Sequence, residues 1–352
     1  GPVCNLEQGK NLPSAAVLVR LAAVLNATTD QILRPTGYTS QPAPERTSAT
    51  ALQEARQHAL PVIRNTNNPA LYLTSSAAPL AANPALARAV ESIVRDYLAL
   101  EDICRVPRQA RIPLQHAFEP TESGLARLAQ LIRTLLGVGD AVVFDHLELF
   151  ENHGLRVVIL PLPEGVSGFS CYDAVNSNVF ILLGAKQNPE RQLFALVYGL
   201  GRILLFNRAL FLGEPPLANE ARKDKAARHF AAEFLMPETA VRTSVEQIGV
   251  RPNEWSYELL LRLKHRFGVS AEAFNYRLLE LRLIQPDRQT ALRAAIRRHY
   301  EEHAFAEPGR SRRILSPNGR LGDLLHTALA RNEPEAAAIA ARIKKLQISV
   351  DL

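Results

Sequence analysis

The sequence predicts an α+β protein that is mostly helical and contains a small β-sheet. From about residue 49 to residue 138 apolar residues recur at three- and four-residue spacing, most clearly in 84–104, which is typical of amphipathic helices. Two short runs, 155–160 and 178–183, are rich in β-branched residues and bounded by Gly, Pro or Asn, so they predict buried strands. Residues 165–178, between these runs, predict a turn-rich connection.

Composition excludes several classes of protein. The chain has 352 residues, enough for two or three domains, and no apolar run approaches the ~18 residues that a membrane span needs. Its cysteines, Cys4, Cys104 and Cys171, are far apart and odd in number, which argues against a disulfide framework and suits a reducing cytoplasm. The net charge of +6 is compatible with nucleic-acid binding without demonstrating it. We therefore expect a cytoplasmic protein that does not enter a membrane.

The main candidate site lies on a long helix predicted from about residue 189 to residue 207. Its segment 191–206 reads RQLFALVYGLGRILLF, and the next predicted helix, 220–235, runs into FAAEFLMP at 230–237. These two segments resemble the ImmA/IrrE metallopeptidase family, in which the first helix carries His-Glu-x-x-His and the second ends in a similar Phe-Ala-Ala motif. Two histidines four residues apart share one face of a helix and can hold one zinc, while the glutamate activates the bound water. The resemblance implies a zincin-like fold.

The residues that would perform this chemistry are replaced. Tyr198 stands at the first histidine position, Gly199 at the glutamate and Arg202 at the second histidine, while the family's acidic third ligand falls on or near Asp224. Glycine has no side chain to act as a base, and an arginine would place a fixed positive charge where the metal sat. We therefore expect no catalytic residues, no metal and no cofactor, and an Arg202–Asp224 salt bridge across the former metal site.

Other interpretations of this region remain open. Gly168-Phe169-Ser170 resembles the family's substrate-side loop, so Phe169 and Ser170, with Tyr198, Arg202 and Asp224, are candidates for a ligand or partner cleft. The helix could also be an amphipathic core helix that never held zinc, or the enzyme could use ligands elsewhere. The nearest histidine in sequence, His229, is more typical of a surface residue than of a ligand.

A second resemblance lies at the N-terminus. Residues 3–33 resemble the second half of a lambda-repressor-like, XRE-family helix-turn-helix domain, through Glu7, Gly9, Lys10, Pro13, Ser14, Leu18, Leu21, Ala22, Leu25, Ile32 and Leu33. In that family the recognition helix enters the major groove and neighbouring residues contact phosphates. The resemblance places Asn5 and Lys10 at DNA-contacting positions. Because the pattern covers only half of the domain, we do not expect residues 3–33 alone to bind DNA specifically. We expect specific DNA binding from the complete helix-turn-helix domain.

The expected organisation has four parts. Residues 1–34 are the C-terminal half of the helix-turn-helix domain, and 35–48, rich in Pro, Ser and Thr, are a linker. Residues 49–250 are an ImmA/IrrE-like pseudo-metallopeptidase domain, and 251–352 are a helical region with a possible sensing or dimerisation role. Within it, residues 255–279 predict a helix, a Gly-containing turn and a helix, a geometry that packs cores more often than it binds DNA.

This organisation predicts a DNA-binding transcriptional regulator whose peptidase-like domain is a sensor or a protein-interaction scaffold. Its expected partners are DNA and a small-molecule or protein effector, and a homodimer would match paired DNA half-sites. Two alternatives remain. The first is a zinc metallopeptidase that cleaves a repressor, and the second is an antitoxin-like or anti-repressor-like interaction module.

Overall fold

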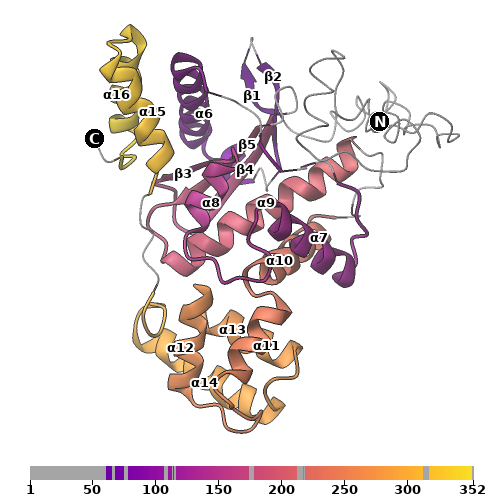
Figure 1. Ribbon diagram of the computed structural model, residues 1–352. Coiled ribbons are helices and arrows are strands. Elements are labelled where there is room, and N and C mark those ends of the chain that lie inside the picture. The colour runs from indigo at the N-terminus through magenta and orange to yellow at the C-terminus, as the bar shows by residue number, and fades with distance from the viewer. Residues whose placement is uncertain are drawn as a thin grey trace, which may run out of the picture. The chain divides into compact units, whose positions relative to one another are not determined.

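The structure is a computed structural model that describes most of the chain after residue 60. The described residues are 61–65, 68–74, 78–106, 110–112, 114, 116–173, 178–211, 217, 219–311 and 317–350. The predicted half helix-turn-helix domain, with Asn5 and Lys10, and the predicted linker at 35–48 lie outside them. Within the described residues the protein is α+β and mostly helical, as the sequence predicts (Figure 1).

Five strands form one mixed sheet within the described residues. They are β1 (Pro61–Asn65), β2 (Asn68–Leu73), β3 (Arg156–Leu160), β4 (Gly168–Asp173) and β5 (Asn178–Gly184). Their order across the sheet is β1-β2-β4-β5-β3, and only the β3–β5 pair is parallel. Strand β4 is therefore the central strand of the sheet.

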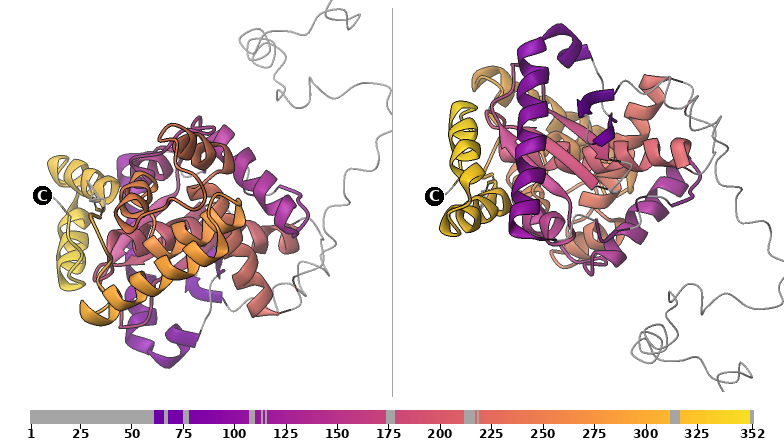
Figure 2. Two further views of the ribbon diagram at one scale, coloured as in Figure 1. Left: turned by 90° about the horizontal axis from the view of Figure 1, so that it is seen from below. Right: turned by 90° about the horizontal axis from the view of Figure 1, so that it is seen from above.

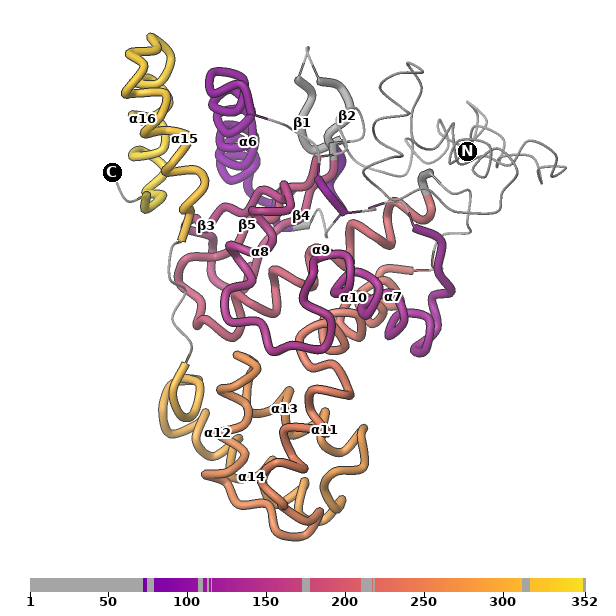
Figure 3. Tube along the Cα trace, in the orientation of Figure 1, coloured from indigo at the N-terminus to yellow at the C-terminus, as the bar shows by residue number. Residues whose placement is uncertain are grey.

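Helices account for most of the remaining described residues (Figures 1 and 3). The helices between β2 and β3 in the chain are α5 (Ala78–Ala82), α6 (Pro84–Cys104), α7 (Glu122–Leu135) and α8 (His146–Asn152). The helices after β5 are α9 (Pro189–Phe211), α10 (Glu220–Leu235), α11 (Glu238–Glu246), α12 (Tyr257–Phe267), α13 (Ala271–Glu280), α14 (Pro286–Glu302), α15 (Gly319–Ala330) and α16 (Pro334–Lys345). In the described part of the chain, no helix is both long and apolar enough to cross a membrane.

Two hydrophobic cores lie on opposite faces of the sheet. Successive residues of a strand point to opposite faces, so in β3 Val157 and Ile159 enter one core while Val158 and Leu160 enter the other. The first core joins the sheet to α7, α9, α10 and the helices α11 to α14, and the second joins it to α6, α15 and α16 (Figure 2). Both faces of β3 and β5 are buried, which explains why these two strands are continuous apolar runs.

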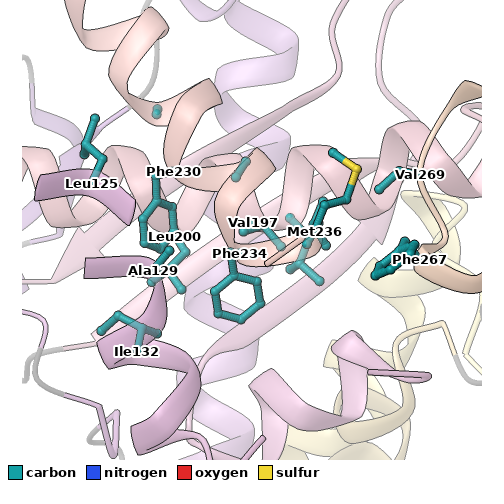
Figure 4. Packing of buried hydrophobic residues seen from close by; sticks show 14 of the residues in the cluster. Leu125, Ala129, Ile132, Val197, Leu200, Phe230, Phe234, Met236, Phe267 and Val269 are labelled. Atoms are coloured by element: carbon teal, nitrogen blue, oxygen red, sulfur yellow. The ribbon is translucent and has the colours of Figure 1, made fainter. Parts of the chain in front are cut away.

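The first core is densest where α7, α9 and α10 meet. Figure 4 shows Phe230 and Phe234 of α10 with Leu200 of α9 and with Leu125, Ala129 and Ile132 of α7 in one cluster. Helices α9 and α10 approach closely at Gly201, where an added Cβ would lie 2.9 Å from the Phe230 ring. This glycine therefore sets the distance between the two helices that carry the candidate site.

The structure differs from the sequence-based expectation in two segments. Pro61–Asn65 and Asn68–Leu73, within a region predicted to be helical, form β1 and β2, and Gly168–Asp173, within the predicted turn-rich connection, forms β4. Leu71–Leu73 of β2 pair with Cys171–Asp173 of β4, about 100 positions away in the chain. Pairing between such distant residues leaves no periodic signal in either segment alone.

A buried group of charges joins α15 to the second core. The carboxylate of Glu101 and the guanidinium of Arg156 form an ion pair at 2.8 Å with both side chains inaccessible to solvent, and Arg320 also contacts Glu101. Glu151 lies nearby and accepts a hydrogen bond from the Arg320 main-chain N–H at 3.4 Å. Burial raises the pKa of Glu151 to about 7, because its charged form loses hydration.

We expect Glu151 to make the stability of the fold depend on pH. Its pKa is about 7 in the folded protein against a usual 4.5, so the folded state favours the protonated carboxyl. The stability contributed by the protonated carboxyl is therefore fully present below pH 4.5 and is lost as the pH rises through about 7. At ~1.4 kcal/mol per pH unit, this loss is at most about 3 kcal/mol.

Urea denaturation at pH 5 and pH 8 measures this effect. Glu151→Gln should reduce the difference in unfolding free energy between the two pH values and should stabilise the protein at pH 8. Glu148→Gln changes an exposed carboxylate on the same helix and is the matched control. Equal pH dependence in the wild type and in Glu151→Gln would contradict the prediction.

Candidate functional site

Helix α9 places the three substituted motif positions against the sheet. Tyr198 and Arg202 are four residues apart, so they lie on one face of the helix. Gly199 faces the sheet, where an added Cβ would lie 3.1 Å from Ile181 and 3.5 Å from Ser170. The position that corresponds to the family's glutamate is therefore buried, with little room for a longer side chain.

Tyr198 and Asp224 come together across the α9–α10 contact. The Tyr198 hydroxyl donates to Asp224 Oδ1 at 2.8 Å, and Arg228 donates to Asp224 Oδ2 at 2.7 Å. The Arg228 guanidinium also lies over the Tyr198 ring, 5.8 Å from its centre. The structure thus brings together two of the predicted residues and adds Arg228, which the sequence analysis did not single out.

These contacts shift the pKa values of both partners in opposite directions. Burial raises the pKa of the Tyr198 hydroxyl, and its hydrogen bond to Asp224 raises it further. Partial burial tends to raise the pKa of Asp224, but the hydrogen bonds from Arg228 and Tyr198 outweigh that tendency and its pKa lies below the usual value. The pair therefore consists of a neutral phenol and a carboxylate at neutral pH.

Arg202 is buried and does not form the expected ion pair. Its side chain is 6% exposed, Nε donates to the main-chain oxygen of Thr74 at 2.8 Å, and Nη2 donates to Glu220 Oε2 at 2.8 Å. The predicted Arg202–Asp224 salt bridge is wrong. Asp224 is already bonded to Tyr198 and Arg228, whereas the long arginine side chain reaches Glu220 one turn earlier on α10.

Strand β4 separates the other two candidate residues. Ser170 faces α9, and its hydroxyl lies 2.7 Å from the Thr74 hydroxyl in a buried hydrogen bond. Phe169, the preceding residue, points into the opposite core with α6 and α15. Phe169 therefore does not line the site, contrary to its assignment from the resemblance, because neighbours in a strand point to opposite faces.

The donor set around α9 does not suit a zinc ion. Zinc binds imidazole, thiolate and carboxylate groups, usually four in a tetrahedron. The Asp224 carboxylate that contacts Tyr198 is already hydrogen-bonded on both oxygens, and the Glu220 carboxylate is paired with Arg202. A guanidinium has no lone pair to donate and stays charged, so Arg202 repels a cation.

One other group in the described residues has metal-ligand character. Ligand atoms of His229, Glu233 and Glu280 lie within 4.8 Å of one another. The guanidinium of Arg277, however, donates to Glu233 at 2.6 and 2.7 Å and to Glu280 at 2.7 Å. Arg277 thus already neutralises these carboxylates and links α13 to α10, so we interpret this cluster as a structural one.

Helices α12 and α13 form a helix-turn-helix whose second helix does not suit DNA. The turn is made by Gly268 in the left-handed region (φ 69°) and by Ser270, whose hydroxyl caps α13. The exposed side chains of α13 are Glu272, Tyr276 and Glu280. None of these side chains carries a positive charge that could contact a DNA phosphate, and Phe274 and Leu278 of α13 lie in the first core, as expected of a motif that packs a core.

Comparisons with known proteins find a family similarity in the central part of the chain. Residues 150–279 match the IrrE N-terminal-like domain of the Peptidase M78 family. A solved structure described as a Mycobacterium tuberculosis transcriptional regulator is similar at 19% identity with a TM-score of 0.31, over 52% of this chain and 51% of that protein. The chain thus spans about half the length of that protein. No curated protein matches the chain.

We expect Arg202 to stabilise the fold mainly through Thr74. Arg202→Met keeps much of the apolar stem but leaves the buried Thr74 oxygen without its donor, at a cost of about 1–3 kcal/mol. Glu220→Gln should cost less than ~1 kcal/mol, because the Glu220 side chain is 61% exposed and its ion pair is screened by water.

Unfolding free energies from urea denaturation compare the two substitutions. If Glu220→Gln destabilised the protein as much as Arg202→Met, the ion pair and not the Thr74 hydrogen bond would be the main contribution of Arg202.

Proposed function

We propose that this chain is a DNA-binding transcriptional regulator whose IrrE-like domain has lost its zinc site and serves as a sensor or a protein-interaction scaffold. The observation that carries the proposal is the burial of Arg202 at the second histidine position, hydrogen-bonded to Thr74 and Glu220. A regulator of this kind would act in the cytoplasm, with DNA and an effector as partners, and would form a homodimer on paired half-sites.

The loss of the zinc site is supported by the chemistry of the replaced positions. Tyr198, Gly199 and Arg202 supply a phenol, no side chain and a cation, and Gly199 has no group that could accept a proton from water. The residues around them, such as Leu200, Leu204 and Phe230, remain buried in the first core. A domain that keeps its packing but lacks catalytic groups suits binding better than peptide hydrolysis.

The DNA-binding part of the proposal rests on residues 3–33, which lie outside the described residues. Their similarity to the second half of an XRE-family domain supports DNA contact through Asn5 and Lys10 in the complete domain. The exposed residues of α13 include no arginine or lysine, which argues against α12 and α13 as the DNA-binding helix-turn-helix. An antitoxin-like or anti-repressor-like module is the second candidate, and the match to an IrrE-like domain is compatible with it.

We expect the wild-type protein to purify without zinc and a double substitution to restore a site. Tyr198→His with Arg202→His would place two imidazoles four residues apart on α9, next to Asp224, and three such ligands can hold zinc. Mass spectrometry should find close to one zinc per chain in this variant and almost none in the wild type.

Adding Asp224→Asn to the double variant is the control and should weaken zinc binding, because the amide is a poorer ligand than the carboxylate. Stoichiometric zinc in the wild-type protein would instead favour the metallopeptidase alternative.

We expect the protein with its complete helix-turn-helix domain to shift DNA fragments from upstream of its own gene. Lys10→Ala should weaken binding and lower the slope of affinity against salt concentration by about 1, as for one lost phosphate contact. Lys344→Ala, an exposed lysine on α16, is the control and should change neither. A gel-shift titration at several salt concentrations measures both, and co-purification of a protein partner without any DNA shift would favour the antitoxin-like candidate.

A further inference from the structure

Strand β2 pairs with β4 and contacts α9. Leu71, Tyr72 and Leu73 face Asp173, Tyr172 and Cys171 of β4 in antiparallel register. The pairing continues one residue further, where the Thr74 N–H donates to the Ser170 oxygen at 2.9 Å. An extended segment from the N-terminal side of the chain thus completes the sheet next to the substituted motif.

The side chains of this segment fill separate positions on the two sides of the sheet. The Tyr72 ring packs against Phe206 of α9, with ring centres 5.5 Å apart, while Leu73 enters the opposite core. The Thr74 hydroxyl contacts both the main-chain oxygen and the hydroxyl of Ser170. All three residues are at most 7% exposed. The positions therefore accept an aromatic, an apolar and a small hydroxyl residue in succession.

Arg202 binds the main chain of this segment. Its Nε donates to the Thr74 oxygen, and Glu220 holds the other end of the guanidinium. The hydrogen bond from Arg202 to a main-chain oxygen can form with any residue at position 74, whereas the surroundings of the side chains restrict which residues fit. Main-chain pairing for affinity and alternate side-chain positions for specificity are the components of β-strand addition, one of the ways proteins bind extended peptides.

The ladder that holds β2 is short. Three residues of β2 face β4, whereas six residues of β4 face β5. On its other side β2 pairs with β1 in an irregular register. Few main-chain contacts thus have to break for β2 to leave, and β4 would still be paired with β5.

We propose that β4, α9 and Arg202 form an exchangeable strand-binding groove, in which Asn68–Thr74 of this chain is the resident strand. The competing occupant is an extended peptide of a partner protein with the pattern aromatic, apolar, Thr or Ser. This inference rests on the proposed function, because it gives the partner of the interaction scaffold a defined chemistry. Since the resident strand is covalently attached, it competes at a high effective concentration and weakens the apparent affinity of the partner.

A peptide-binding experiment with the full chain tests the exchange. The probe is the fluorescein-labelled, C-terminally amidated peptide of residues 68–74, Asn-Pro-Ala-Leu-Tyr-Leu-Thr, and fluorescence anisotropy reports binding. Tyr72→Ala with Thr74→Ala weakens the resident strand but leaves the groove intact. This variant should bind the peptide at least about tenfold more tightly than the wild type, because the resident strand competes less.

A disulfide can lock the resident strand in place. Leu73 faces Cys171, and facing residues of antiparallel strands have Cα atoms about 4.5–5.5 Å apart, within the range of a disulfide. Oxidised Leu73→Cys should therefore bind no peptide, and reduction should restore binding. Leu73→Ser, treated with the same oxidant, is the matched control and should be insensitive to it.

The contribution of Arg202 is measured in the weakened background. Adding Arg202→Gln to Tyr72→Ala with Thr74→Ala should lower peptide affinity by about tenfold, since a charged hydrogen bond to the main chain is lost. A peptide of scrambled sequence should bind none of the variants. Peptide binding that is the same in the locked and the weakened protein would overturn the proposal, as would an absence of binding to every variant that folds.

Hydrogen exchange of the wild-type protein provides a test that needs no substitution. The amides of Tyr72, Leu73 and Thr74 should exchange through a local opening that leaves the amides of β5 protected. Exchange of β2 and β5 at the same rate, by global unfolding alone, would show that the strand is permanent. Loss of the promoter shift with retained peptide exchange would refute the proposed regulator but not the groove, and the reverse result would refute the groove alone.

Discussion

A guanidinium that is almost completely buried needs acceptors for its N–H groups, and the region around α9 is arranged to supply them to Arg202. One acceptor is the main-chain oxygen of Thr74, after β2, and the other is Glu220, at the start of α10. Burial of an unpaired arginine would cost several kcal/mol. The hydrogen bonds of this one side chain therefore connect the outer part of the sheet, the central helix and the next helix.

In the same region, side chains connect α9 to α10. In a zinc peptidase the ion would cross-link the first helix to the second. Here the Tyr198–Asp224 hydrogen bond makes that connection, and Arg202 adds one to Glu220 and one to Thr74. The close approach of α9 to α10 at Gly201 and the aromatic residues of α10 then complete the core between the two helices.

The chain uses further buried ion pairs where segments distant in sequence meet. Lys264 of α12, which is inaccessible to solvent, binds Glu190 at the start of α9 and Glu307 after α14. Glu101 and Arg156 pair with Arg320 on the other side of the sheet. Such pairs add little net stability compared with apolar packing, but a wrong arrangement would leave a buried charge unpaired, so they favour one arrangement of the helices.

The sequence by itself determined the features that depend on local periodicity. The spacing of apolar residues located α9 and α10, and the continuous β-branched runs located β3 and β5, because a helix face and a buried strand repeat within a few residues. The substitutions at Tyr198, Gly199 and Arg202 were also visible, since the motif is contiguous. Only the tertiary structure decided the partners of these residues. Thr74 lies 128 positions from Arg202 and carries no motif, and β2 pairs with β4 although the two strands are about 100 positions apart in the chain. Interactions between such distant residues form only when the sheet brings them together, so the local sequence pattern cannot predict them.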